Sequence, residues 1–138
     1  MTNMDPITGR SPVTDSGESP HKGKTSLTRI WNALFYSLAG LAAAFRHEPA
    51  FRLEVLLAVI LIPVALAMPV SGLGKGLLIG AVLLTLIVEL VNAAIEATVD
   101  RISLENHPFA KRAKDIGSAA VFVSLVNLAA IWLLVLFG

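Results

Sequence analysis

Residues 76–100 read GLLIGAVLLTLIVELVNAAIEATVD. The first half of this stretch is almost entirely apolar, and the whole is longer than the about 20 residues that a helix needs to cross the hydrocarbon of a bilayer. The second half carries Glu89, Asn92, Glu96 and Asp100 at spacings typical of one helical face. We therefore predict a membrane-spanning helix over 76–99 with a polar stripe toward its C-terminal end.

Two further apolar segments are long enough to span a membrane. Residues 53–70 form one, with Glu54 near its start and Pro63 inside it, and residues 116–137 form the other. Glycine, serine and proline between 69 and 74 predict a turn. Residues 27–46 have the apolar periodicity of one helical face, with tryptophan and tyrosine, which favour the headgroup level. The sequence therefore predicts an all-α membrane protein with an interfacial amphipathic helix and three spans.

The composition excludes several other classes of protein. Of 138 residues, 55% are hydrophobic and 15% are charged, whereas soluble domains average about 45–50% and about 25%. The absence of cysteine excludes a disulfide scaffold, a thiolate zinc site and a cysteine nucleophile. A net charge of +1 argues against nucleic acid as the main partner. Residues 1–26, rich in Pro, Gly, Ser and Thr, are expected to form a disordered tail before a membrane domain over 27–138.

The basic residues predict the orientation in the membrane. They gather before the first span and between the second and third spans, whereas the turn between the first two spans holds only Lys75. The positive-inside rule then places the N-terminus and residues 101–114 in the cytoplasm and the C-terminus on the far side. The residues that decide this are Arg29, Arg46, Arg52, Arg101, Lys111, Arg112 and Lys114.

The polar stripe is the most informative feature for function. On a helix, Glu96 and Asp100 lie within about 20° of Glu89, and Asn92 about 60° away. The rise per residue places Glu89 about 10 Å deeper than Glu96 and about 16 Å deeper than Asp100. An ionisable group inside hydrocarbon costs at least about 2.5–3.5 kcal/mol and usually marks a functional site.

Other acidic residues are expected near the same membrane surface: Glu48, Glu54, Glu105 and Asp115. Carboxylates without thiolates are the ligands that magnesium prefers, and the neighbouring arginines and lysines suit phosphate. Asp115 also fits the N-cap of the third spanning helix. A polar seam between packed helices and a proton-coupled transporter subunit remain alternatives, but the carboxylates lie at one end of the span, which favours chemistry at the interface.

The stretch ELVNAAIEATVD at 89–100, followed by AKDIGSAAV at 113–121, closely resembles the signature of the bacterial integral-membrane diacylglycerol kinases. Arg29, Tyr36, the stretch EPAFRLE at 48–54 and the pair Glu105 and His107 match that family in order and spacing. The resemblance covers 27–138. It implies a homotrimer of three-span subunits in the inner membrane that transfers the γ-phosphoryl group of ATP to diacylglycerol, with Mg²⁺, to give phosphatidic acid. A related branch phosphorylates undecaprenol, which stays open as an alternative.

The resemblance also implies individual roles. Glu89 matches the general base that takes the proton from the lipid hydroxyl, and Glu48 and Glu96 match the magnesium ligands. The positions that match nucleotide contacts are Arg29, Tyr36, Glu48, Glu96, Glu105, His107, Lys114 and Asp115. The positions that match lipid contacts are Arg29, Phe51, Arg52, Glu54, Glu89, Ser118 and Trp132. Asn92 and Asp100 resemble supporting members of the polar stripe.

Overall fold

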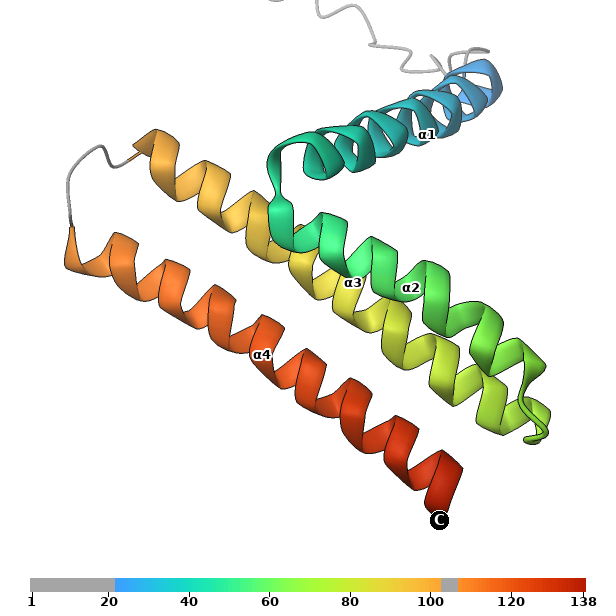
Figure 1. The fold of residues 1–138 in the computed structure, drawn as a ribbon. Helices are drawn as coiled ribbons and strands as arrows, with labels where there is room; N and C mark the ends of the chain where they lie inside the picture. The colour runs from blue at the N-terminus through green and yellow to red at the C-terminus, as the bar shows by residue number, and fades with distance from the viewer. Residues whose placement is uncertain (1–21, 103–106) are drawn as a thin grey trace, which may run out of the picture. The chain divides into compact units, whose positions relative to one another are not determined.

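The computed structural model describes residues 22–102 and 107–138, which form four α-helices. These are α1 (Lys22–His47), α2 (Pro49–Ala67), α3 (Gly72–Ile102) and α4 (Pro108–Phe137) (Figure 1). The predicted all-α fold class is confirmed. Within the described residues, α2, α3 and α4 are each long and apolar enough to cross a membrane, which agrees with the three predicted spans.

The chain divides into two compact units, Met1–Tyr36 and Ser37–Gly138. The described part of the first unit is the N-terminal part of α1, whose apolar residues Leu27, Ile30, Trp31 and Leu34 are exposed. This pattern suits a helix lying in a membrane interface. The second unit holds the remainder of α1 and the three spanning helices.

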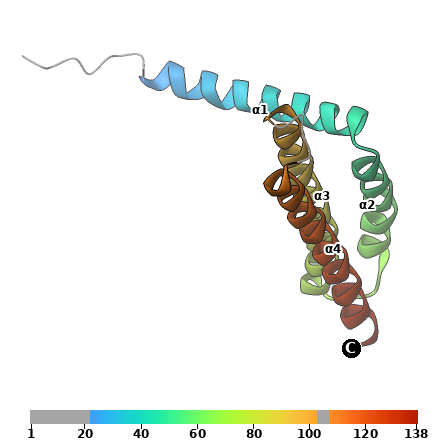
Figure 2. The same ribbon diagram turned by 90° about the vertical axis from the view of Figure 1, so that its left-hand side faces the viewer.

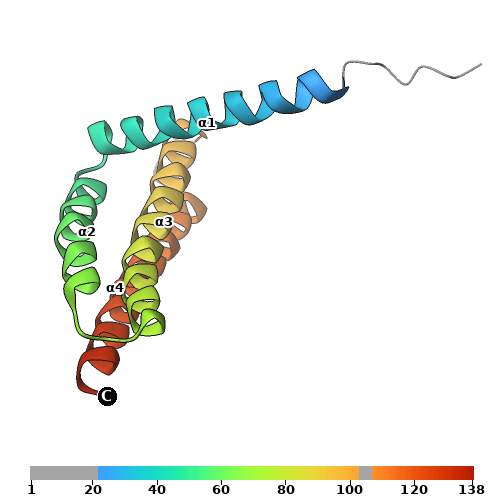
Figure 3. The ribbon, with the colours of Figure 1, turned by 90° about the vertical axis from the view of Figure 1, so that its right-hand side faces the viewer.

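Helix α3 packs against both α2 and α4 in the second unit. The three helices alternate in direction, so the N-termini of α2 and α4 and the C-terminus of α3 share one end (Figures 2 and 3). We call this the polar end, because it holds Glu48, Asp100 and Lys114. The α2–α3 turn and the C-terminus lie at the opposite end (Figures 2 and 3).

Small side chains bring the helices together. The core consists of Ala58, Ala81, Val82 and Leu128, all buried. Alanines at such positions let helix backbones approach closely, which is how spanning helices associate without a hydrophobic driving force. Many larger apolar side chains on the outside of α2, α3 and α4 are exposed, as expected for a surface that faces lipid or other protein.

The ends of the helices differ from the predicted ends of the spans. α2 begins at Pro49, where the fixed backbone of proline suits a first helical position, and Pro63 does not end it. α3 begins at Gly72 inside the predicted turn, and α4 begins at Pro108, so much of the segment 101–114 is helical. The apolar runs predicted the length that hydrocarbon can bury, whereas all three helices continue past these runs at the polar end, and α2 ends at Ala67, before the predicted end of its span at residue 70.

The expectation that Asp115 caps the third spanning helix is wrong. His107 is the N-cap of α4, and its Nδ1 accepts a hydrogen bond of 3.3 Å from the backbone N–H of Phe109. Asp115 lies about two turns further along, where it forms an ion pair of 2.6 Å with Lys111. The capping pair His107 and Pro108 starts the helix earlier than the apolar sequence indicates.

Candidate active site

The polar stripe of α3 lies as helix geometry predicted. Glu89 is 3% exposed and Asn92 is 8% exposed, whereas Glu96 is half-buried and Asp100 is exposed. Exposure therefore increases from Glu89 toward the polar end. A single helix face thus leads from a buried carboxylate to a solvent-accessible one.

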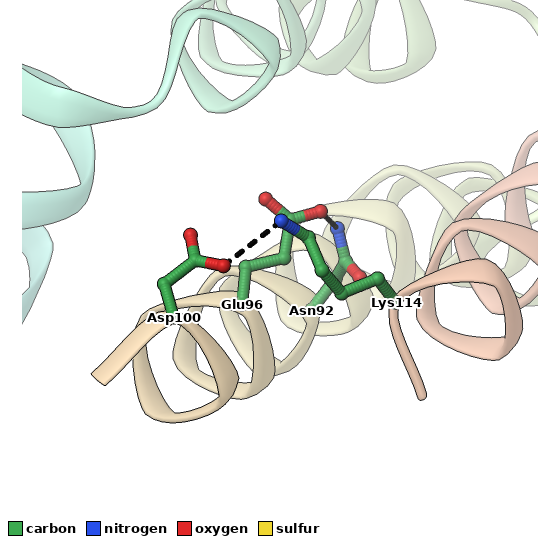
Figure 4. A network of polar contacts seen from close by, with 4 residues as sticks. All are labelled: Asn92, Glu96, Asp100 and Lys114. Carbon is green, nitrogen blue, oxygen red and sulfur yellow. Dashed lines mark hydrogen bonds and ion pairs between the residues drawn. The ribbon is translucent and has the colours of Figure 1, made fainter. Parts of the chain in front are cut away.

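Two contacts organise the outer part of this stripe (Figure 4). Asn92 Nδ2 donates a hydrogen bond of 3.2 Å to Glu96 Oε1. Lys114 Nζ, which comes from α4, forms an ion pair of 3.0 Å with Asp100 Oδ1. Figure 4 shows the Lys114 side chain reaching across to the face of α3 that carries Glu96 and Asp100. Helix α4 therefore supplies a positive charge to an otherwise acidic face.

Further carboxylates lie on the elements next to Glu89. Glu96 lies two turns further along the same helix, and Glu48 immediately precedes α2. Glu54 is on α2, which packs against α3. Glu54 is 8% exposed, and its Oε2 accepts no hydrogen bond from the described part of the chain. We call Glu48, Glu54, Glu89 and Glu96 the carboxylate cluster.

The junction between α1 and α2 positions Glu48. This residue precedes Pro49 in extended conformation, and its side chain makes no capping hydrogen bond. Arg52 Nη1 donates to the carbonyl oxygens of Phe45 at 3.3 Å and Arg46 at 3.1 Å. A cation at these last carbonyls of α1 stabilises the helix end. Arg52 of α2 therefore ties the end of α1 to α2 across Glu48.

Two members of the cluster are candidate ligands for a magnesium ion of the kind that accompanies ATP. Within the residues that the structure describes, no group of three or more His, Cys, Asp or Glu side chains is placed to hold a metal. Magnesium at nucleotide sites commonly uses only one or two carboxylates and takes its other ligands from phosphate and water. Glu48 and Glu96 can supply two carboxylates. The Glu48 side chain makes no capping hydrogen bond, and in Glu96 only Oε1 accepts the hydrogen bond from Asn92.

The structure gathers only some of the residues predicted to contact the nucleotide. Lys114 meets the stripe through Asp100, whereas Asp115 is exposed and pairs with Lys111. The His107 ring stacks on Phe109 with centroids 5.4 Å apart. Arg29 and Tyr36 are exposed positions of the first unit. Glu105 lies outside the described residues.

The residues predicted to contact the lipid are more dispersed. Phe51 is buried on α2, close in sequence to Glu54, and Ser118 is exposed on α4. Trp132 packs against the core cluster, and its indole N–H donates a hydrogen bond of 3.3 Å to the carbonyl of Leu78. Leu78 is about 16 Å along α3 from Glu89, away from the polar end. Trp132 therefore joins α4 to α3 far from the carboxylate cluster.

An apolar groove borders Glu48. Its volume is about 680 Å³, and small side chains such as Gly40, Ala44, Ala93 and Ala97 line much of it, together with His47. The groove lies between the second-unit part of α1 and the outer face of α3. A hollow of this composition can accept a flexible apolar group beside the carboxylates.

Sequence reasoning missed Gly117. This buried residue of α4 faces Asn92, whose side chain occupies the space that a Cβ atom on residue 117 would need. A glycine within an otherwise apolar helix often marks a close approach, and this was the available signal.

Comparisons with known proteins show the family of this chain. The family model described as prokaryotic diacylglycerol kinase matches residues 35–136. The chain is 59% identical over 120 residues to a diacylglycerol kinase of Pseudomonas aeruginosa, which covers 87% of this chain and 98% of the relative. It is 45% identical over 108 residues to one from Haemophilus influenzae, covering 78% and 92% of the two chains. It is 42% identical over 114 residues to one from Escherichia coli K12, covering 83% and 93%. The chain therefore belongs to the prokaryotic diacylglycerol kinase family.

Proposed function

We propose that this chain transfers the γ-phosphoryl group of ATP to the free hydroxyl of diacylglycerol at the carboxylate cluster, giving phosphatidic acid and ADP. Family membership and the name diacylglycerol kinase of its relatives support the reaction. The observation that carries the location is the buried Glu89 at the inner end of a polar stripe. A transporter would need polar groups along the whole span, whereas these lie toward one end.

Glu89 is the proposed general base. The lipid oxygen attacks the γ-phosphorus, the hydroxyl proton passes to the Glu89 carboxylate, and the bond from phosphorus to the β-phosphate oxygen breaks with its electron pair leaving on ADP. A carboxylate removed from water is a stronger proton acceptor than an exposed one. Its depth also suits the hydroxyl of a glycerolipid, which lies just below the headgroups.

Glu48 and Glu96 are the proposed magnesium ligands. Magnesium held there would neutralise charge on the transferred phosphate. The two carboxylates come from different helices, and the Arg52 contacts to α1 and the Asn92 contact to Glu96 hold them in place. In phosphoryl transfer, positioning of the reactants accounts for most of what a protein contributes.

Lys114 is the proposed partner of the ATP phosphates. Its ammonium already lies beside the stripe and pairs with Asp100, which is exposed and easily exchanged for another anion. We assign His107 and Asp115 to the rest of the nucleotide site, and the nucleotide contacts that the resemblance implies for Arg29, Tyr36 and Glu105 stay predictions. The apolar groove beside Glu48 is assigned to the lipid, and Phe51, Glu54 and Ser118 remain predicted lipid contacts.

The proposed assembly is a homotrimer in the bacterial inner membrane, with the polar end toward the cytoplasm. The charge distribution supports this orientation, because Arg46, Arg52, Arg101 and Lys114 lie toward the polar end and Lys75 lies at the opposite one. The exposed apolar surface of the spanning helices supports contact with lipid and with further copies.

The decisive test is an assay of purified protein in mixed micelles with labelled ATP and magnesium. Diacylglycerol and undecaprenol are offered separately, and the Glu89→Gln variant is measured beside the parent. We expect labelled phosphatidic acid from the parent and at least about a hundredfold less from the variant. A preference for undecaprenol would overturn the substrate assignment, and no product from either lipid would overturn the kinase function.

A further inference from the structure

The contact between Gly117 on α4 and Asn92 on α3 is unlike the surroundings of the glycines of α3. A Cβ atom on residue 117 would overlap Asn92 Oδ1 and lie 3.3 Å from its Cγ. In α3, a Cβ atom on Gly72, Gly76 or Gly80 would meet nothing within 4 Å, and the atoms nearest to one on Gly74 belong to the apolar side chains of Val70 and Val135. Gly117 is therefore the place where the absence of a side chain makes room for a polar group of the stripe.

The Asn92 amide has a definite orientation in this space. Its Nδ2 faces Glu96 and donates to Oε1 at 3.2 Å. Its Oδ1 is buried against Gly117 and accepts no hydrogen bond from the described residues. The reverse orientation would set the amide oxygen against the Glu96 carboxylate, and two acceptors repel each other. The attraction to Glu96 therefore holds the amide in place although its oxygen is left without a donor.

A side chain at position 117 would displace this amide. The space beside it is a hollow of about 190 Å³ whose walls are mainly apolar: Ile87, Val88, Val91, Ile95 and Ala120. An Asn92 side chain pushed into this hollow loses its contact with Glu96 and gains no polar partner from these walls.

We propose that Gly117 is a positioning residue for the magnesium site: it admits the Asn92 amide between α3 and α4, and this amide orients the Glu96 carboxylate. The inference rests on the proposed function, in which Glu96 binds the metal. The hydrogen bond from Asn92 fixes the position of Oε1 of Glu96. Because both oxygens belong to one carboxylate, the same hydrogen bond also sets the direction of Oε2. Groups that orient a metal ligand typically change metal affinity by about 10–100-fold when they are removed.

The test measures metal binding apart from turnover. Mn²⁺ is titrated into the full-length protein by electron paramagnetic resonance in the presence of a nonhydrolysable ATP analogue, and the magnesium dependence of activity is measured in parallel. We expect Gly117→Ala to weaken Mn²⁺ binding about tenfold. The matched control Gly76→Ala, which adds the same methyl group where nothing is in contact, should bind as the parent does.

A double-mutant cycle separates positioning from helix packing. If Gly117 acts through Asn92, then Asn92→Ala alone weakens Mn²⁺ binding about as much as Gly117→Ala, and adding Gly117→Ala to Asn92→Ala changes it by less than about twofold. An equal, additive effect of Gly117→Ala in both backgrounds would overturn the proposal. So would parent-like binding by Asn92→Ala, a result that does not depend on whether Gly117→Ala assembles.

Glu96→Gln distinguishes this inference from the proposed function. Parent-like Mn²⁺ binding by Glu96→Gln would overturn the metal assignment and the inference with it. Weakened binding by Glu96→Gln, together with parent-like binding by Asn92→Ala and Gly117→Ala, would overturn the inference and leave the metal assignment standing.

Discussion

Lys114 Nζ on α4 lies 3.0 Å from Asp100 Oδ1 on α3, and this ion pair joins the two helices at the polar end. Both side chains are accessible, so water and salt screen the attraction between them. Such a pair keeps the ammonium beside the stripe without holding it tightly. The Lys114 charge is therefore available to an arriving phosphate.

Lys114→Met should raise the KM for ATP at least about tenfold, because it removes the proposed charge-assisted contact to the phosphates. Asp100→Asn keeps the lysine and should change this KM less than about threefold. Steady-state kinetics with varied ATP in mixed micelles measures both. A larger effect from Asp100→Asn would show that the aspartate, and not the lysine, governs nucleotide binding.

Glu48→Gln and Glu96→Gln should each raise the magnesium concentration needed for half-maximal activity, since each removes an anionic oxygen from the proposed ligand set. Glu96→Asp keeps the charge on a shorter side chain and should lie between Glu96→Gln and the parent. Magnesium titrations at fixed ATP measure this. Unchanged magnesium dependence in both glutamine variants would show that the metal binds elsewhere.

The spans and the polar stripe could be predicted from the sequence because each follows from a local period. Apolar length predicts a span, and spacings of three and four predict that Glu89, Asn92 and Glu96 share a face. The helix ends could not be predicted in the same way. His107 and Pro108 start α4 before its apolar residues begin, so Asp115 is inside the helix and not at its cap.

Contacts between helices were harder to predict than contacts within one. The overlap of the Asn92 side chain with the Cβ position of residue 117 depends on how α3 and α4 cross, and no pattern within either helix encodes that distance. Arg52 is a similar case. Its guanidinium donates to the carbonyls of Phe45 and Arg46 at the end of α1, a contact that no pattern within α2 encodes.

Lys75→Met should destabilise the α2–α3 turn without affecting catalysis. Lys75 Nζ donates a hydrogen bond of 2.7 Å to the carbonyl of Leu66 in the last turn of α2, at the end opposite the carboxylate cluster. Loss of one such bond costs about 1 kcal/mol of unfolding free energy. Thermal unfolding in detergent should show a lowered midpoint with unchanged kcat, and Lys75→Arg should restore it. A reduced kcat in folded Lys75→Met would contradict this separation.

Deletion of residues 1–21 should leave specific activity nearly unchanged. These residues precede α1, which begins at Lys22, and lie outside the segment that matches the family. The truncated protein keeps every residue assigned to the site. A loss of more than about tenfold in a well-folded truncation, which corresponds to about 1.4 kcal/mol, would show that the deleted segment contributes to the reaction.

Glu89→Gln should separate chemistry from binding. Glutamine keeps the shape of the side chain but cannot accept the hydroxyl proton, and loss of a general base typically costs about 10²–10⁴-fold in rate. It also removes a charge from a position that is 3% exposed within a spanning helix, so the variant should assemble at least as well as the parent. We expect parent-like binding of MgATP and a kcat at least about a hundredfold lower.

The control for this prediction is Asp100→Asn, which removes a carboxylate from the same stripe about 16 Å nearer the polar end. At that distance Asp100 cannot reach a lipid hydroxyl that is in contact with Glu89, as proposed, so Asp100→Asn should lose much less of kcat. Comparable activity in an assembled Glu89→Gln variant would remove Glu89 from the role of base. Loss of MgATP binding by Glu89→Gln would instead assign it to the metal site, and a larger loss of kcat in Asp100→Asn would overturn the link between depth and catalysis.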